Sequence, residues 1–272
     1  MSSIPSPADT FVPHVFHFFS DHFPIVMDFE TISIASFNVL NQAYMKPKYM
    51  KEQGLDGSFL TLMTEDERTT AIVKLVMSML KEHAIPIVAL QEVSPKVLAR
   101  LLDEAKGYVV IPAPNMKGDG VDYGVIILDP AKIGICGYMK VDAYEGDSPD
   151  KYIQRIKLYL KEKDHVFFTF CNTHAKFGAM GSLIYTLKNV EGPIICCGDF
   201  NVGANCSQKE MSITPLLEEK EFKLWLSHAP HSHVDTKQEL KLVDHFYTRD
   251  MDLKDNHALL ALLRKDLSFK EN

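Results

Sequence analysis

Residues 194–201 form a short apolar segment that ends in polar side chains, and this segment limits the possible folds of the chain more than any other. Four apolar residues follow Gly192 and Pro193 and lead directly into Gly-Asp-Phe-Asn. An apolar run of this length, bounded by Gly and Pro, is typical of a buried strand. Asp199 and Asn201 stand two apart, and on an extended chain such residues point to the same side. The segment therefore predicts a strand that delivers a carboxylate and a carboxamide to one point.

An Asx-turn that closes a strand is the simpler interpretation of this segment, and taken alone it is the more frequent one. The segment gains weight because other predicted strands also have polar residues at their ends. These residues are Asn38, Glu92, His174, Asp244 and His257. Each has a structural alternative, such as a turn former, a first-turn acid of a helix or a salt-bridge partner. Strand ends that share one rim are common places for functional loops, so together they indicate a site.

The hydrophobic pattern predicts many strands with a few helices between them. Strands are expected at 31–37, 85–90, 108–111, 123–128, 133–141, 156–160, 166–171, 194–197, 242–247 and 258–263. A capping box at Thr64 and Glu67 predicts one helix, and Ser94-Pro95 begins a second whose inner stripe includes Leu102. Further helices are expected at 182–189 and 215–222. This mixture favours an α/β sandwich of two sheets packed face to face with helices outside.

The 272-residue chain has no linker-like segment, so we expect one domain at 29–272 preceded by an N-terminal extension at 1–28. The net charge of −7 argues against a broad basic face that grips duplex DNA. Cys196 and Cys197 lie in a predicted buried strand, which indicates free thiols in a reducing compartment. We therefore expect an intracellular protein, in the cytoplasm rather than the nucleus. No apolar run is long enough for a transmembrane helix.

The order of several short motifs resembles the endonuclease/exonuclease/phosphatase superfamily. The motifs lie at 36–40 (Ser-Phe-Asn-Val-Leu), 90–93 (Leu-Gln-Glu-Val), 123–125 (Tyr-Gly-Val), 172–174 (Asn-Thr-His), 197–201 (Cys-Gly-Asp-Phe-Asn), 243–247 (Val-Asp-His-Phe-Tyr) and 256–257 (Asn-His). The resemblance implies a DNase I-like four-layered α/β sandwich with two mixed sheets. The N-terminal third of the chain is most similar to the deadenylase branch of this superfamily. It has a Lys- and Tyr-containing loop at 44–51 and Arg68 at the start of a helix.

The resemblance also implies roles for individual residues. The metal, Mg²⁺ with Mn²⁺ as an alternative, would be held by Asn38, Glu92, Asp199 and Asn201. The catalytic residues would be His174, Asp199, Asn201, Asp244 and His257. Tyr123, Arg155 and His174 would contact the substrate, although a solvated charge on a strand face is the simpler interpretation of Arg155.

The last motif departs from the family pattern. That motif usually reads Ser-Asp-His-x-Pro, whereas residues 255–259 read Asp-Asn-His-Ala-Leu. The interval between Asp244 and His257 is also shorter than usual. The leading hypothesis is a Mg²⁺-dependent phosphodiesterase on single-stranded nucleic acid, a 3′–5′ exoribonuclease of deadenylase type that prefers RNA to DNA. The alternatives are a DNA endonuclease or repair enzyme, a phosphoinositide or sphingomyelin phosphatase, and an inactive binding module.

Overall fold

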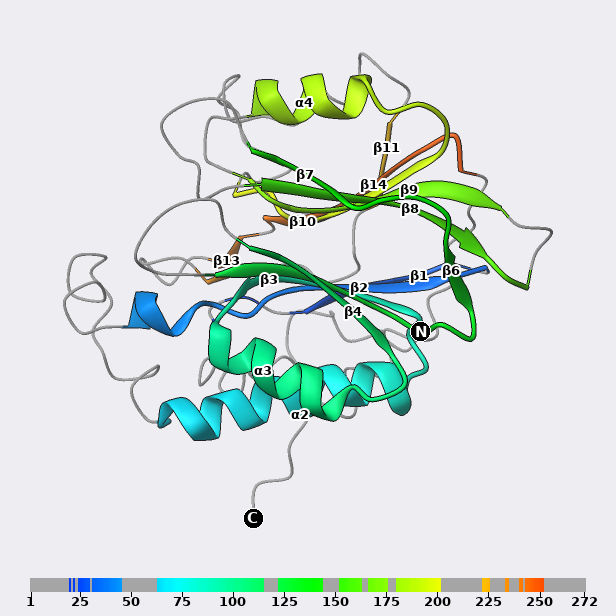
Figure 1. The fold of residues 1–272 in the computed structure, drawn as a ribbon. Helices are drawn as coiled ribbons and strands as arrows, with labels where there is room; N and C mark the ends of the chain where they lie inside the picture. The colour runs from blue at the N-terminus through cyan, green and yellow to red at the C-terminus, as the bar shows by residue number, and fades with distance from the viewer. Residues whose placement is uncertain are drawn as a thin grey trace, which may run out of the picture.

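The chain folds into four layers, with two β-sheets packed face to face between helices (Figure 1). The computed structural model describes residues 20, 22, 24–29, 31–45, 63–114, 122–143, 152–162, 166–175, 180–201, 222–225, 233–234, 240–241 and 243–251. Helices α2 (Glu65–Lys81) and α3 (Pro95–Glu104) cover the outer face of one sheet, and α4 (Met180–Lys188) covers the outer face of the other. This arrangement confirms the predicted α/β sandwich.

The first sheet has the strand order β1-β2-β3-β5-β4. Its strands are β1 (Ile25–Asp28), β2 (Ser33–Asn38), β3 (Ile87–Val93), β4 (Val109–Pro114) and β5 (Tyr123–Leu128). Strands β2 and β3 are parallel, and the other pairs are antiparallel. Strand β1 lies in the part of the chain that we interpreted as an extension, and it adds an edge strand beside β2.

The second sheet has the strand order β11-β14-β10-β9-β8-β6, and β7 also pairs with β8. Its strands are β6 (Ile133–Ile135), β7 (Lys140–Ala143), β8 (Tyr152–Leu160), β9 (Phe167–His174), β10 (Ile194–Asp199), β11 (Lys223–Trp225) and β14 (Asp244–Arg249). The single strand predicted at 133–141 is thus two strands, because β6 and β7 pair with different parts of β8. Strands β12 (His233–Val234) and β13 (Leu240–Lys241) form a separate pair, and the 3₁₀ helix η3 (Gln42–Met45) follows β2.

Both predicted helix starts are present. The Thr64 hydroxyl accepts from the Glu67 N–H, and the Glu67 carboxylate accepts from the Thr64 N–H at 2.8 Å, which completes the capping box of α2. Ser94 caps α3, with Pro95 at its first position. One prediction within α3 is wrong, since Leu102 is 52% exposed. The buried residues of this helix form the narrow stripe of Val97, Leu98 and Leu101.

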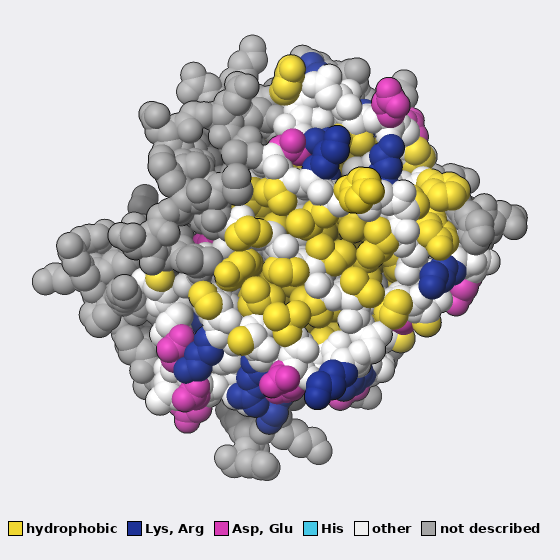
Figure 2. Space-filling model, viewed as in Figure 1, with side chains coloured by type: hydrophobic (Ala, Val, Ile, Leu, Met, Phe, Trp, Pro, Cys, Tyr) yellow, Lys and Arg dark blue, Asp and Glu magenta, His cyan; other side chains and the backbone are white. Residues whose placement is uncertain are grey.

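Alternation along the strands divides the apolar residues between two cores. Residues such as Ile34, Phe170 and Ile195 fill the layer between the sheets, whereas Phe37 and Leu90 pack toward α2 and α3. On the face shown in Figure 2, hydrophobic side chains form a central band, and Lys, Arg, Asp and Glu side chains lie mainly around it. None of the described helices is long and apolar enough to cross a membrane. The helix predicted at 215–222 and the strand predicted at 258–263 lie outside the described residues, apart from Phe222.

Candidate active site

Strand pairing in the second sheet places three polar side chains in one row. Strand β9 is parallel to β10, so its last residue, His174, lies opposite Asp199, the last residue of β10. Strand β14 is antiparallel to β10, so its first residue, Asp244, lies on the other side of Asp199. Asp199 follows Ile195 and Cys197 on the face that packs against the first sheet. All three side chains are therefore held between the sheets, and each is only 1% exposed.

The first sheet contributes Asn38 and Glu92 to the same end of the sandwich. Asn38 continues the inward-facing series of Ile34 and Ser36 on β2. Glu92 does not follow the alternation of its own strand, because Leu90, two residues earlier, faces the helices. A register shift between Leu90 and Val93 and a positive φ of 56° at Glu92 turn its carboxylate inward. Bulges of this kind often re-aim a side chain next to a functional site.

Asn38 joins the carboxylates of the two sheets. Its Nδ2 donates to Asp199 Oδ2 at 2.9 Å and to Glu92 Oε1 at 3.1 Å. Its Oδ1 accepts from the Leu40 N–H at 3.0 Å. In this orientation Asn38 holds Glu92 and Asp199 together, whereas the sequence suggested that it could be a metal ligand.

Asn201 orients Asp199 from the loop that follows β10. The Asn201 N–H donates to Asp199 Oδ1 at 2.7 Å, and its side-chain Nδ2 donates to the Ala175 carbonyl at 2.8 Å. The first of these bonds closes an Asx-turn. Residues 194–201 therefore form the turn that was the simpler interpretation of this segment, and they also contribute Asp199 to the site. Asn201 has a φ of 52°, a left-handed conformation that Asn adopts more readily than most residues. These contacts leave Asp199 Oδ2 directed toward Asn38.

Glu92, His174 and Asp199 could hold a metal ion. His174 Nε2 lies 3.3 Å from Glu92 Oε1 and 3.6 Å from Asp199 Oδ2. The candidate ligand atoms of the three residues all lie within 4.8 Å of one another. Two buried carboxylates this close together repel each other, and a divalent cation between them would offset that repulsion. The donor set therefore fits a divalent metal.

Comparison with solved structures identifies the fold. The chain superposes on TDP2 from D. rerio in complex with a single-stranded DNA product, with a TM-score of 0.55 and 13% identity over 81% of this chain and 84% of that chain. It superposes on ANGEL2, a 2′,3′-cyclic phosphatase, with a TM-score of 0.55 and 14% identity over 85% and 84% of the two chains. A Bacteroides vulgatus endonuclease/exonuclease/phosphatase matches with a TM-score of 0.53 and 16% identity over 83% and 87%. The chain has the endonuclease/exonuclease/phosphatase fold.

The likeness is visible in three dimensions rather than in the overall sequence. No protein-family model and no curated protein sequence matches the chain. The resemblance inferred from the order of short motifs is thus confirmed at the level of the fold. The roles that it implies for individual residues stay predictions.

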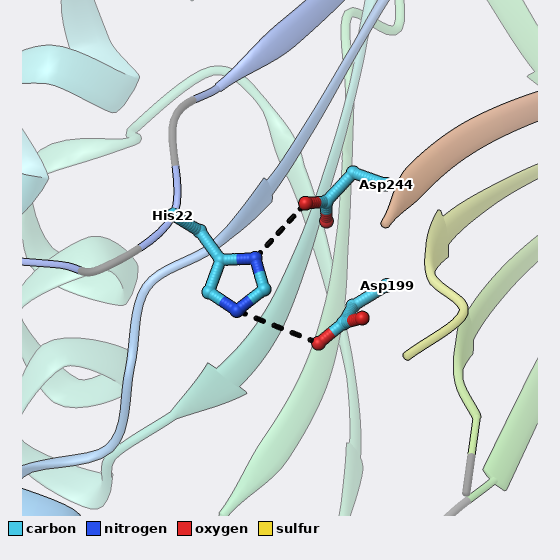
Figure 3. A group of neighbouring side chains, drawn as sticks. All are labelled: His22, Asp199 and Asp244. Carbon is cyan, nitrogen blue, oxygen red and sulfur yellow. Dashed lines mark hydrogen bonds and ion pairs between the residues drawn. The ribbon is translucent and has the colours of Figure 1, made fainter. Parts of the chain in front are cut away.

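One residue of the site was missed by the sequence analysis. His22 Nδ1 lies 2.9 Å from Asp244 Oδ2, and His22 Nε2 lies 3.7 Å from Asp199 Oδ2, so the ring stands between the two carboxylates (Figure 3). The signal was present, because residues 20–24 read Ser-Asp-His-Phe-Pro, the pattern sought at 255–259. We overlooked this pattern because we interpreted residues 1–28 as an extension.

Two predicted site residues, Tyr123 and Arg155, do not belong to this cluster, and a third is not described. His257 lies outside the described residues. The side chain of Tyr123 packs against the core on the helix-covered face of the first sheet. Arg155 lies on β8 between the inward-facing Gln154 and Ile156, and its Nε is 2.5 Å from Asp142 Oδ2 on β7. Arg155 thus faces away from the layer between the sheets.

Proposed function

We propose that this protein is a metal-dependent phosphodiesterase that shortens RNA from its 3′ end, a 3′–5′ exoribonuclease of deadenylase type. The observation that carries the proposal is the convergence of Glu92 and Asp199, from different sheets, with His174 at distances suited to one metal ion. Phosphate-ester chemistry has precedent on this fold. ANGEL2 is a 2′,3′-cyclic phosphatase, and a Bacteroides thetaiotaomicron protein with a TM-score of 0.52 is a mannosyl-6-phosphatase.

The chemistry of the donor set favours Mg²⁺, with Mn²⁺ as an alternative. Mg²⁺ binds hard oxygen ligands, keeps several waters and is usually held by one or two carboxylates. Glu92 and Asp199 supply these two carboxylates, and Asn38 holds them in position. A bound Mg²⁺ would neutralise the charge that develops on the phosphoryl oxygens.

The protein's own residues have separate tasks in this proposal. Asp199 orients the attacking water and accepts its proton, and the hydrogen bonds from Asn38 and Asn201 fix the orientation of its carboxylate. In this proposal the carboxylates of Glu92 and Asp199 hold the metal, and His174 Nε2, which lies beside both of them, donates to a phosphate oxygen. Glu92, which is 8% exposed, is the least buried of the three carboxylates, so its side of the site faces the entering substrate.

Single-stranded RNA is the proposed substrate because of the sequence. The N-terminal third resembles the deadenylase branch, and the net charge of −7 does not suit a broad duplex-binding face. We propose the Lys- and Tyr-containing loop as the RNA contact, and its residues 46–51 lie outside the described residues. We assign the activity to the cytoplasm, where the described cysteines Cys136, Cys171, Cys196 and Cys197, none of which is in a disulfide, would stay reduced.

A substrate panel tests the proposal. The purified protein with Mg²⁺ is offered oligo(A), mixed-sequence RNA, RNA with a 2′,3′-cyclic phosphate end, single- and double-stranded DNA, and an inositol phosphate. We expect single-stranded RNA to be shortened from its 3′ end faster than any other substrate is cleaved, and Glu92→Gln to remove this activity. Faster nicking of duplex DNA would contradict the RNA assignment. Turnover of none of the substrates would contradict the enzymatic proposal and favour an inactive binding module.

A further inference from the structure

We propose that His22 is a catalytic residue of this site, in the position for which the sequence suggested His257, and that the chain carries the superfamily's last motif and strand at its beginning. The proposal rests on the proposed function, because it assigns a phosphate contact to the same site. Three independent observations support it: the contacts of the His22 ring, the anchoring of its segment, and the sequence around it.

The ring of His22 is oriented by a buried carboxylate. Its Nδ1 lies 2.9 Å from Asp244 Oδ2, and both side chains are almost completely buried. A carboxylate that binds one ring nitrogen fixes which nitrogen is presented on the other side. Here Nε2 is presented toward Asp199, 3.7 Å from its Oδ2, at the edge of the candidate metal site (Figure 3).

The segment that carries His22 is anchored beside Asn38. The Ser20 hydroxyl donates to the Asn38 carbonyl at 2.8 Å and accepts from the His22 N–H at 3.1 Å. Directly afterward, β1 pairs with β2 from Ile25 opposite Ser36 to Asp28 opposite Ser33. Ile25 and Met27 are buried in the core between the sheets. The strand that delivers Asn38 therefore also holds His22.

The sequence around His22 matches the family pattern better than the sequence around His257. Residues 20–24 contain all the specified residues of Ser-Asp-His-x-Pro, and a strand follows at once. Residues 255–259 match that pattern only at the histidine. Moving a terminal segment from one end of a chain to the other preserves the packing when the ends lie at the surface. The chain is thus circularly permuted relative to the usual motif order.

The geometry gives His22 a specific task in hydrolysis. The oxygen of water bonds to phosphorus, its proton passes to Asp199, and the bond from phosphorus to the 3′ oxygen breaks with the electron pair on that oxygen. His22, as the imidazolium with a proton on each ring nitrogen, donates from Nδ1 to Asp244 and from Nε2 to a non-bridging phosphoryl oxygen while the negative charge on that oxygen grows. Asp244 holds the ring in the orientation that this bond requires.

The test compares His22→Asn with the matched variant His257→Asn in the full-length chain. Asn at position 22 keeps a donor near the place of Nδ1, so its contact with Asp244 survives, but it has no group at Nε2. We expect His22→Asn to lower kcat/KM on the best RNA substrate by about 100-fold or more, with a nearly unchanged thermal unfolding midpoint. His257→Asn should keep the wild-type kcat. His22→Ala should regain part of its kcat when imidazole is added, whereas Glu92→Gln should not.

A binding measurement separates this inference from the proposed function. Inorganic phosphate is titrated into each variant in the presence of Mg²⁺ and followed by calorimetry, which needs no turnover. We expect His22→Asn to weaken phosphate binding about tenfold, the loss of one charge-assisted hydrogen bond, and His257→Asn to leave it unchanged. The inference is overturned if His22→Asn binds phosphate as the wild type does, if His257→Asn alone loses binding, or if the wild type binds no phosphate. Phosphate binding that depends on His22 in a protein without turnover would support this inference and contradict only the enzymatic proposal.

Discussion

The two sheets contribute to the site by different means. In the second sheet, regular pairing alone places His174, Asp199 and Asp244 side by side, because the ends of β9 and β10 and the start of β14 coincide. In the first sheet, Asn38 follows the regular alternation, but Glu92 reaches the site only through a bulge and a positive φ. Regular strand pairing thus places the side chains at the strand ends in one row. The carboxylate of Glu92 reaches that row only because its strand is irregular.

The irregular end of the first sheet has its own support. Arg68, on α2, is 1% exposed and donates to the carbonyls of Val39 and Leu40, directly after Asn38. Leu40 has a φ of 52°, so the chain turns sharply at this point. In the second sheet the corresponding end is held by neighbouring strands and their loops, since the Phe200 N–H donates to the Val243 carbonyl at 3.0 Å and Asn201 Nδ2 donates to the Ala175 carbonyl at 2.8 Å. The Glu92 side of the site thus depends on a helix, whereas the Asp199 side depends on the pairing of strands.

Removing either carboxylate should have the largest effect. Glu92→Gln and Asp199→Asn keep the size of each residue but remove a charge, so each should lower kcat/KM about 1,000-fold, or about 4 kcal/mol. EDTA should abolish the wild-type activity. Mg²⁺ should raise the unfolding midpoint of the wild type but not of either variant, because a ligand stabilises only the state that binds it.

The matched control for both carboxylates is Glu191→Gln, which alters an exposed acid that precedes β10, at the end of that strand opposite to Asp199. It should leave the rate and the Mg²⁺ response unchanged. Full activity of Glu92→Gln, together with a loss in Asp199→Asn, would show that only the regularly paired sheet serves the reaction.

A methyl group at Gly198 should disrupt the second sheet. A Cβ there would lie 1.9 Å from the Thr173 carbonyl oxygen on β9, and Gly198 has a φ of 142°. Gly198→Ala should lower the free energy of unfolding by about 4 kcal/mol, measured by urea denaturation. Gly192→Ala is the control, because Gly192 has a φ of 75° but no atom within 4 Å of its Cβ position. That variant should lose only about 1 kcal/mol. Equal losses would mean that the backbone conformation, and not the clash, sets the cost.

Loss of the Arg68 side chain should destabilise the first sheet. Arg68→Met leaves the buried carbonyls of Val39 and Leu40 without this donor, which should cost about 3 kcal/mol of unfolding free energy. Arg100→Met on α3 removes an exposed arginine that pairs with Glu104 at 2.8 Å and should cost at most about 1 kcal/mol. We also expect Arg68→Met to lower activity at temperatures where it is folded. Unchanged stability would show that the turn after Asn38 does not need this support.

The smallest effect is expected in the polar layer that joins the two sheets behind the site. Asn172 on β9 accepts from Gln91 Nε2 at 2.8 Å and donates to the Leu90 carbonyl at 3.0 Å. Asn172→Ala should cost about 2 kcal/mol of unfolding free energy. Asn189→Ala, at an exposed asparagine near the end of α4, should cost about 0.5 kcal/mol. A loss no larger than that of the control would mean that the apolar core alone holds the sheets together.

The sequence by itself was sufficient to predict the local features of this protein. The capping box at Thr64, the cap at Ser94 and most strands were predictable because they depend on neighbouring residues and on periods of two or 3.6 residues. The polar residues at strand ends were recognisable for the same reason. Four of them, Asn38, Glu92, His174 and Asp199, contact one another.

The tertiary structure alone decided which distant residues meet. His22 and Asp244 are 222 positions apart, and their contact depends on β1 pairing with β2 and β14 pairing with β10. The inward turn of Glu92 breaks the alternation of its strand, and the face on which Arg155 lies depends on the packing of β8. A local pattern shows which residues share a face, but strand order and register determine what that face meets, and they follow from contacts between segments that are remote in the chain.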